Sequence, residues 1–197
     1  MQTQRIVRTL TALALVGGFT LAAQAQVGSG WTSYSPGHKI QNVGSGSVSG
    51  MTFKITSSST STEQRSEFRY DDITSAQSQM QGNVVVNSLG GDRISIAQIH
   101  GTPSATSLLG IKKPGVLYEV ATGATVGNLA IGASARINMT VVTKTGVCQI
   151  YLNGSAKTSA SNSTLQAPYY HKIGVYRTGS GKGPVTVTWS NVKFWKK

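Results

Sequence analysis

Three short segments of the sequence carry side chains that can hold an anion and move a proton. They are Arg65-Ser66-Glu67-Phe68-Arg69, Gln98-Ile99-His100, and the stretch Tyr-His-Lys-Ile-Gly-Val-Tyr from Tyr170 to Tyr176. Residues two apart on a β-strand share a face. If each segment is a strand, one face carries two arginines, a carboxylate, an amide, an imidazole, an ammonium and two phenols. The pattern predicts a surface that binds an anion and transfers a proton.

The elements that must position these segments are β-strands, because no stretch beyond residue 25 keeps a helical period. Short β-branched and alternating runs recur instead, separated by Gly, Ser, Asn and Thr turns. The expected strands are Met51–Thr56, Ser66–Tyr70, Asn83–Asn87, Arg93–His100, Gly115–Val120, Ala135–Thr143, Val147–Leu152, His171–Tyr176, Val185–Trp189 and Val192–Trp195. The pattern predicts an all-β protein, an antiparallel β-sandwich or jelly roll.

Three connecting stretches are interpreted separately. A short helix is expected around Tyr70–Gln81. The Ser/Thr-rich stretches Ser57–Thr62 and Lys157–Thr164 are expected to be loops between strands.

The chain opens with the pattern of a secretory signal peptide. Arg5 and Arg8 form a basic region, an apolar run follows from Leu10 to Leu21, and Ala23-Gln24-Ala25 is typical of a cleavage site. The apolar run is too short to span a membrane. We expect residues 1–25 to be removed and residues 26–197 to form a single domain, secreted or periplasmic, with no membrane association.

The net charge predicts an anionic partner. Removing residues 1–25 takes away two of the 18 basic residues and none of the six acidic ones, which leaves a net charge of +10. Nucleic acid, an acidic membrane surface and an acidic polysaccharide all match a positive charge of this size. The basic residues are scattered along the chain, which disfavours a nucleic-acid partner.

Neither a disulfide nor a bound cofactor is expected. Cys148 is the single cysteine, it lies in an apparent strand, and we interpret it as a small buried apolar residue. The three histidines and six carboxylates show no metal-ligand spacing. No phosphate-binding loop and no Gly-x-Ser-x-Gly motif is present.

In this order, the three segments resemble the signature of polysaccharide lyase family 7, the alginate lyases. That family shows an Arg-Ser/Thr-Glu-Leu/Val-Arg strand, a Gln-Ile/Val-His strand and a C-terminal Tyr-x-Lys-Ala-Gly-x-Tyr strand. The resemblance implies a jelly roll whose concave sheet face binds the polymer. It also implies β-elimination on a 1,4-linked polyuronate, alginate above all, giving products with a 4,5-unsaturated uronate at the non-reducing end. No metal or organic cofactor is implied.

The resemblance also implies a role for each site residue. The catalytic residues are His100, Tyr176, Gln98 and Arg69, and the substrate-binding residues are Arg65, Lys172, Glu67 and Tyr170. The arginines and the Gln98 amide hold the charge that develops on the substrate carboxyl group. His100 is neutral at mild pH and takes the C5 proton. Tyr176 protonates the departing oxygen, or acts as the base when that proton lies on its side.

The sequence departs from the family pattern at three places in the last segment. Ile173 replaces an alanine, Arg177-Thr178 follows the final tyrosine, and His171 stands where an aromatic residue is common. These differences leave the preferred uronate open, so that a glucuronan lyase of related fold is an alternative within the enzyme class.

A binding protein is the alternative from a different class. A non-catalytic carbohydrate-binding sandwich could stack sugar rings on four aromatic residues, Trp31, Tyr118, Tyr151 and Trp189. The base and acid pair formed by His100 and Tyr176 favours the enzyme, because binding alone needs neither. In both readings the partner is an anionic polysaccharide, and we expect a monomer.

Overall fold

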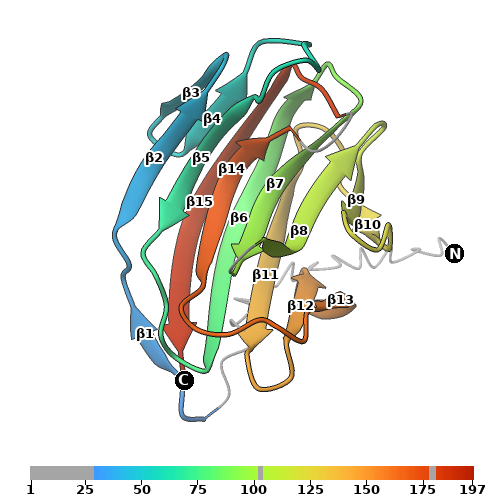
Figure 1. Ribbon diagram of the computed structural model, residues 1–197. Coiled ribbons are helices and arrows are strands. Elements are labelled where there is room, and N and C mark those ends of the chain that lie inside the picture. The colour runs from blue at the N-terminus through green and yellow to red at the C-terminus, as the bar shows by residue number, and fades with distance from the viewer. Residues whose placement is uncertain (1–28, 102–103, 178–180) are drawn as a thin grey trace, which may run out of the picture.

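The computed structural model describes residues 29–101, 104–177 and 181–197, so the expected signal peptide at residues 1–25 lies outside the described residues. Every secondary-structure element that it assigns is a β-strand. The strands form two antiparallel sheets stacked face to face (Figure 1). The predicted antiparallel β-sandwich is confirmed.

The two sheets have eight and seven strands. The back sheet has the order β13-β12-β11-β6-β15-β4-β3, and β1 pairs with β15 beside this path. Its strands are β1 (Thr32–Tyr34), β3 (Gly46–Ser49), β4 (Thr52–Ile55), β6 (Gln77–Leu89), β11 (Ser134–Val142), β12 (Val147–Leu152), β13 (Ser155–Ser161) and β15 (Val185–Lys196).

The front sheet has the order β10-β9-β8-β7-β14-β5-β2. Its strands are β2 (His38–Val43), β5 (Arg65–Tyr70), β7 (Arg93–His100), β8 (Ala105–Lys112), β9 (Val116–Glu119), β10 (Thr125–Asn128) and β14 (Tyr170–Tyr176). The three segments with functional side chains are therefore adjacent strands, with β14 between β5 and β7.

The core lies between the sheets and explains which face of β14 points outward. Ile173 and Val175 are fully buried in the apolar cluster, while Tyr170 and Tyr176 are partly exposed. The same alternation buries Phe68 on β5 and Ile99 on β7. The hydrophobic effect therefore fixes which face of each strand is available for chemistry. Cys148 is also fully buried, as predicted.

Two predictions for the connecting stretches are wrong. Residues 70–81 form no helix, because Ile73 pairs with Tyr169 and β6 begins at Gln77. β6 is paired with β11 on one side and with β15 on the other, and this pairing overrides the local helix propensity of its Gln and Met residues. Most of the expected loop Lys157–Thr164 belongs to the edge strand β13, whereas Ser57–Thr62 is irregular as predicted.

The sequence patterns also missed or divided several strands. β1, β2, β3, β8 and β10 were not predicted, and the two strands expected from Val185 onward form the single strand β15. Its register with β6 shifts between Ser190 and Lys193, and Asn191 has a positive φ of 52° at that point. This irregularity interrupts the alternation, which explains why the sequence reads as two strands.

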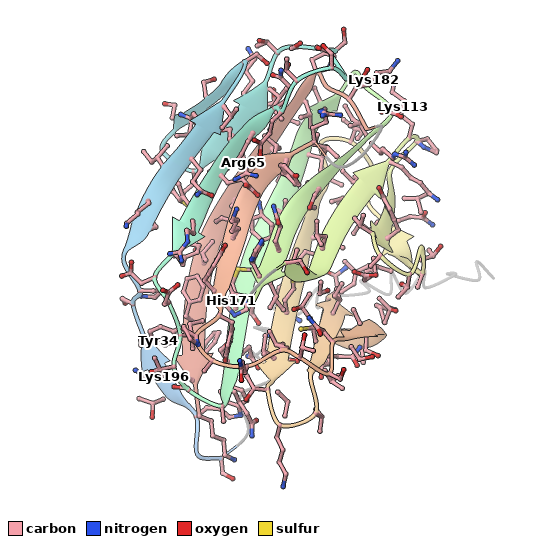
Figure 2. All side chains as sticks on the ribbon, in the orientation of Figure 1. Tyr34, Arg65, Lys113, His171, Lys182 and Lys196 are labelled. Atoms are coloured by element: carbon pink, nitrogen blue, oxygen red, sulfur yellow. The ribbon has the colours of Figure 1, made fainter. Side chains whose placement is uncertain are left out.

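One pocket of about 610 Å³ lies at the end of the sandwich where β1 meets β15. Tyr34, Tyr70 and Phe194 are among its lining residues. Tyr34 is well separated from Arg65 in Figure 2, and none of the eight side chains predicted for the site lines this pocket. We therefore place the candidate site on the outer face of the front sheet instead.

The core contains one histidine, which joins the two sheets. His171 on β14 is fully buried, and its Nε2 atom makes a 2.8 Å hydrogen bond with the hydroxyl group of Ser78 on β6. Within the described part of the chain, its Nδ1 atom has no hydrogen-bond partner. Burial lowers the pKa of His171 from 6.5 to about 3, so the imidazole is neutral in the folded protein.

His171 should make the fold sensitive to acid. Below pH 6.5 the unfolded chain binds a proton at this residue that the folded chain does not bind, so stability falls as the pH drops towards 3. Each pH unit well inside this window costs up to about 1.4 kcal/mol. We predict that His171→Phe flattens the pH dependence of the free energy of unfolding, measured by urea denaturation at several pH values. Ser78→Ala removes the same hydrogen bond and should keep the wild-type slope; equal slopes in wild type and His171→Phe would contradict the prediction.

Gly174 on β14 allows β14 and β5 to approach closely. Its φ is +139°, and a Cβ atom there would lie 2.3 Å from the carbonyl oxygen of Ser66 and 2.7 Å from the Cα atom of Glu67. No other residue type has room at this position. The glycine of the third sequence segment therefore has a structural role.

We predict that Gly174→Ala destabilises the protein by about 2 kcal/mol more than Gly123→Ala. Gly123 also has a positive φ, of +73°, but a Cβ atom there would meet nothing within 4 Å. An alanine is strained by the positive φ at both positions, more so at +139° than at +73°, and only Gly174 adds a steric conflict. Urea denaturation of both variants measures the difference, and equal losses of stability would show that β5 can move away.

Candidate active site

The register of three neighbouring strands brings the predicted side chains together on the outer face of the front sheet. Lys172 on β14 lies opposite Arg69 on β5 and opposite Gln98 on β7. Towards one end of β14, Tyr170 lies opposite His100. Towards the other end, Tyr176 lies opposite Arg65, and Glu67 lies opposite Gly174 between them. All eight predicted residues are therefore on three adjacent strands.

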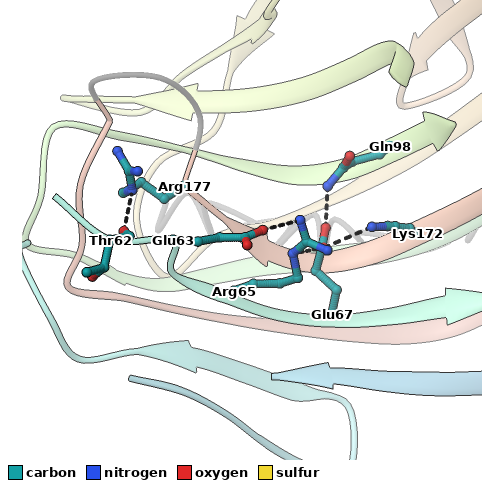
Figure 3. A network of polar contacts seen from close by, with 7 residues as sticks. All are labelled: Thr62, Glu63, Arg65, Glu67, Gln98, Lys172 and Arg177. Carbon is teal, nitrogen blue, oxygen red and sulfur yellow. Dashed lines mark hydrogen bonds and ion pairs between the residues drawn. The ribbon is translucent and has the colours of Figure 1, made fainter. Parts of the chain in front are cut away.

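A buried carboxylate lies at the centre of this surface. Glu67 is only 2% exposed, and its carboxylate accepts a hydrogen bond from the Nε2 amide of Gln98 (Figure 3). The Nζ atom of Lys172 lies 3.4 Å from its other oxygen, Oε2, and the Nε atom of Arg65 lies 3.2 Å from the same oxygen. We call these four residues the Glu67 network. The network fixes an amide, an ammonium and a guanidinium group around one negative charge.

The Glu67 network shifts the pKa values of its buried members. Burial raises the pKa of Glu67, and the nearby Lys172, Arg65 and Gln98 oppose this shift. Burial also lowers the pKa of Lys172, while Glu67 opposes that shift. A buried charge is expensive without a partner of opposite sign. The carboxylate therefore makes it possible to keep cationic side chains buried on this face of the sheet.

The contacts of Arg65 link the network to the Tyr176 end of the surface. Its Nη2 atom forms an ion pair with Glu63, and its guanidinium carbon lies 4.7 Å from the centre of the Tyr176 ring. Beyond it, the Nε atom of Arg177 donates a 3.0 Å hydrogen bond to the carbonyl oxygen of Thr62 (Figure 3). The Arg177 that departs from the family pattern thus connects the end of β14 with the irregular Ser57–Thr62 segment.

His100 has the geometry of a general base. Its Nδ1 atom lies 2.7 Å from the carbonyl oxygen of Gly101. Because a carbonyl oxygen only accepts, Nδ1 carries the proton, and in the neutral ring Nε2 keeps its lone pair. Burial lowers the pKa of His100; the Gly101 bond opposes this, and Lys172, Arg65 and Arg69 add to the lowering. The imidazole is therefore neutral at neutral pH.

Tyr170 and Arg69 complete the His100 end of the surface. The rings of His100 and Tyr170 are stacked, with centroids 5.0 Å apart and planes within 6°. The guanidinium carbon of Arg69 lies 3.8 Å from the centre of the Tyr170 ring. A 2.6 Å ion pair with Asp72 holds the Nη2 atom of Arg69.

The structure does not bring His100 and Tyr176 into direct contact. Tyr176 lies opposite Ser95 on β7, whereas His100 lies opposite Tyr170, six residues earlier on β14. The two predicted proton-transfer groups therefore stand at the two ends of the Glu67 network.

Sequence reasoning missed several side chains next to the site. Lys39 and Gln41 on β2 lie opposite Arg69 and Glu67 and share their face of the sheet. Glu63 and Asp72 each pair with one of the two site arginines. Glu63 and Asp72 could have been recognised from the sequence, because they are acidic residues close to the two arginines. Strand β2 could not, because this exposed edge strand has no clear alternation of apolar and polar residues.

Of the four aromatic residues proposed for a carbohydrate-binding module, two are buried and a third lies away from the site strands. Trp189 is 1% exposed and Tyr118 is 6% exposed, so neither can stack on a sugar ring in this structure. Tyr151 lies on β12 of the back sheet, away from the three site strands. These side chains were proposed because they are aromatic, and their burial was not visible from residue type.

Two further observations concern metals and membranes. Among residues 29–101, 104–177 and 181–197, no three His, Cys, Asp or Glu side chains are grouped so that they could hold a metal ion. The same residues include no helix long and apolar enough to cross a membrane.

We predict that Glu67→Gln destabilises the protein by about 3 kcal/mol, because Lys172 would keep a buried charge without its counterion. Glu63→Gln is the matched control: this carboxylate pairs with the same Arg65, but its side chain is 47% exposed. It should cost less than about 1 kcal/mol. Urea denaturation at neutral pH compares the two, and equal losses would show that the network does not stabilise the fold.

Comparison with known proteins identifies the family. A family profile described as "Alginate lyase" matches residues 42–196. This range includes the three segments and confirms the resemblance. A search of curated protein sequences finds no significant match.

Solved structures of alginate lyases share the fold. The enzyme from Corynebacterium sp. matches with a TM-score of 0.57 and 20% identity, covering 68% of this chain and 69% of that chain. A marine family 7 enzyme from Zobellia galactanivorans matches with a TM-score of 0.60 and 17% identity, covering 74% and 77%. Another family 7 alginate lyase matches with a TM-score of 0.55 and 19% identity, covering 74% and 79%. With the family match, these structures lead to one conclusion: the chain belongs to the alginate lyase family and is a polysaccharide lyase.

Proposed function

We propose that this protein cleaves the 1,4-linkages of alginate by β-elimination and leaves a 4,5-unsaturated uronate at the new non-reducing end. The observation that carries the proposal is the tautomer of His100: the Gly101 carbonyl holds the proton on Nδ1, which leaves a basic Nε2 beside a cationic, amide-bearing surface. We also propose that the anionic polymer is the partner of a monomeric protein. Residues 1–25 direct its export to the periplasm or the medium.

The first requirement of the reaction is to stabilise negative charge on the carboxyl group of the uronate. Loss of the C5 proton places charge on that group, and hydrogen-bond donors that are already in position lower the barrier. Gln98 uses one N–H of its amide to contact Glu67, which leaves its second N–H for the substrate. Arg69 and Arg65 supply guanidinium groups, which match a carboxylate in geometry. Lys172 adds positive electrostatic potential from its buried position beside Glu67.

The proton and electron movements then balance as follows. The Nε2 atom of His100 takes the C5 proton, and the electrons of the broken C–H bond form the C4=C5 double bond. The bond from C4 to the glycosidic oxygen breaks, and the Tyr176 hydroxyl donates a proton to that oxygen. This step requires the Tyr176 hydroxyl and the Nε2 atom of His100 to reach the same linkage from the two ends of the Glu67 network. The two transfers leave an imidazolium at His100 and a phenolate at Tyr176. Arg65 lies near enough to stabilise the phenolate charge, since its guanidinium carbon lies 4.7 Å from the centre of the Tyr176 ring. The phenolate takes a proton from water, and His100 releases its proton to the resulting hydroxide, which restores both groups.

The substrate is alginate rather than glucuronan in this proposal, because the family match covers all three segments. The decisive experiment follows the ultraviolet absorbance of the unsaturated uronate during incubation with polymannuronate, polyguluronate and glucuronan in parallel. A rise on one or both alginate polymers supports the proposal. A rise on glucuronan alone would favour that related lyase, and binding without any rise would contradict the proposed reaction.

We predict that His100→Ala and Tyr176→Phe each reduce kcat at least 100-fold, while polymer binding is largely kept. Because the pKa of His100 is lowered, the wild-type enzyme should retain activity at pH values below 6.5 before the base becomes protonated. Initial rates across a range of pH values, together with binding to an uncleaved polymer, measure both effects. Full activity in either variant would remove that residue from the proposed mechanism.

A further inference from the structure

The ring of Tyr170 lies between His100 and Arg69, two side chains with different roles in the proposed reaction. His100 is the proposed base, and Arg69 is a proposed ligand of the substrate carboxyl group. The Tyr170 ring is parallel to the imidazole, with centroids 5.0 Å apart, and the Arg69 guanidinium carbon lies 3.8 Å from its centre.

The strand order shows that the two groups cover opposite faces of the ring. β14 lies between β7, which carries His100, and β5, which carries Arg69 (Figure 1). The near-parallel rings mean that one face of the phenol is turned towards β7. Its other face is therefore turned towards β5, where Arg69 lies. The result is a three-layer stack of imidazole, phenol and guanidinium.

We infer that Tyr170 is a positioning residue whose ring, rather than its hydroxyl group, holds the base and the carboxylate ligand in a fixed relation. The inference rests on the proposed roles of His100 and Arg69. It replaces the direct substrate-binding role that the family resemblance implies for Tyr170.

The stack restrains the two groups in different ways. The Gly101 hydrogen bond fixes which nitrogen of His100 carries the proton, but a single bond still allows the ring to rotate about it. Contact with the Tyr170 face removes that freedom. For Arg69, the ion pair with Asp72 holds one end of the guanidinium group, and the ring holds its plane. Because displacement of a reacting group by about 1 Å can cost 100-fold in rate, such restraint matters for turnover.

The stack also excludes water from the imidazole. Burial is the largest cause of the lowered pKa of His100, and Arg69 contributes to the same lowering. Removing the ring would hydrate His100 and release Arg69. Both changes favour the protonated imidazole, so the acid limb of the rate profile would move to higher pH.

The test compares Tyr170→Leu with Tyr170→Phe. We expect Tyr170→Leu to lower kcat about 10- to 100-fold, to raise KM for alginate, and to move the acid limb of kcat/KM to higher pH. We expect Tyr170→Phe to recover the wild-type pH profile and to stay within about threefold of its kcat, because it keeps the ring. Tyr151→Leu on the back sheet is the matched control for loss of a partly exposed tyrosine. Thermal unfolding of each variant checks that it is folded.

A second readout separates this inference from the proposed function. Titration of the His100 imidazole by NMR, without substrate, should give a higher midpoint in Tyr170→Leu than in wild type or Tyr170→Phe. This result would support the stack even if His100→Ala proved active. An unchanged midpoint and an unchanged acid limb in Tyr170→Leu would overturn the inference. So would an equal loss of kcat in Tyr170→Phe, because the hydroxyl group would then be the essential part.

Discussion

The arrangement of the site depends on one buried negative charge. Glu67 is the shared partner of Gln98, Lys172 and Arg65, and it lies on the middle strand of the β2, β5 and β14 group. Several cationic side chains on one sheet face repel one another, and their burial adds a desolvation cost. A carboxylate beneath them offsets both costs. The surface can then present positive charge and an oriented amide to a polyanion.

β14 connects this chemistry to the stability of the sandwich. Its outward side chains take part in the site, and the inward ones, His171, Ile173 and Val175, belong to the core. Gly174 brings the strand against β5 so closely that no side chain fits. The strand therefore has little freedom to move away from its neighbours. Its rigidity is the reason that groups more than 100 residues apart in the sequence, such as Glu67 and Lys172, keep a fixed geometry.

The alternation of single strands predicted the main features of the fold and the outward faces of β5, β7 and β14. That information is local, since it depends only on residues two apart. The stack of His100, Tyr170 and Arg69 was beyond reach, because it depends on strand order and register between distant segments. The edge strand β2 escaped detection because it is exposed on both faces and lacks an apolar stripe. The helix expected around Tyr70–Gln81 failed because pairing on both sides of β6 outweighed its local preference.

The buried His171 has a consequence for engineering the enzyme. Its imidazole lies on the inner face of the strand whose outer face carries Tyr170 and Lys172, and its one hydrogen-bond partner among the described residues is the Ser78 hydroxyl. Redesign of the outer face for activity at low pH would therefore not be enough, because acid would still destabilise the fold through the buried His171. A variant library aimed at acidic process conditions should begin with position 171 and only then change the residues that contact the polymer.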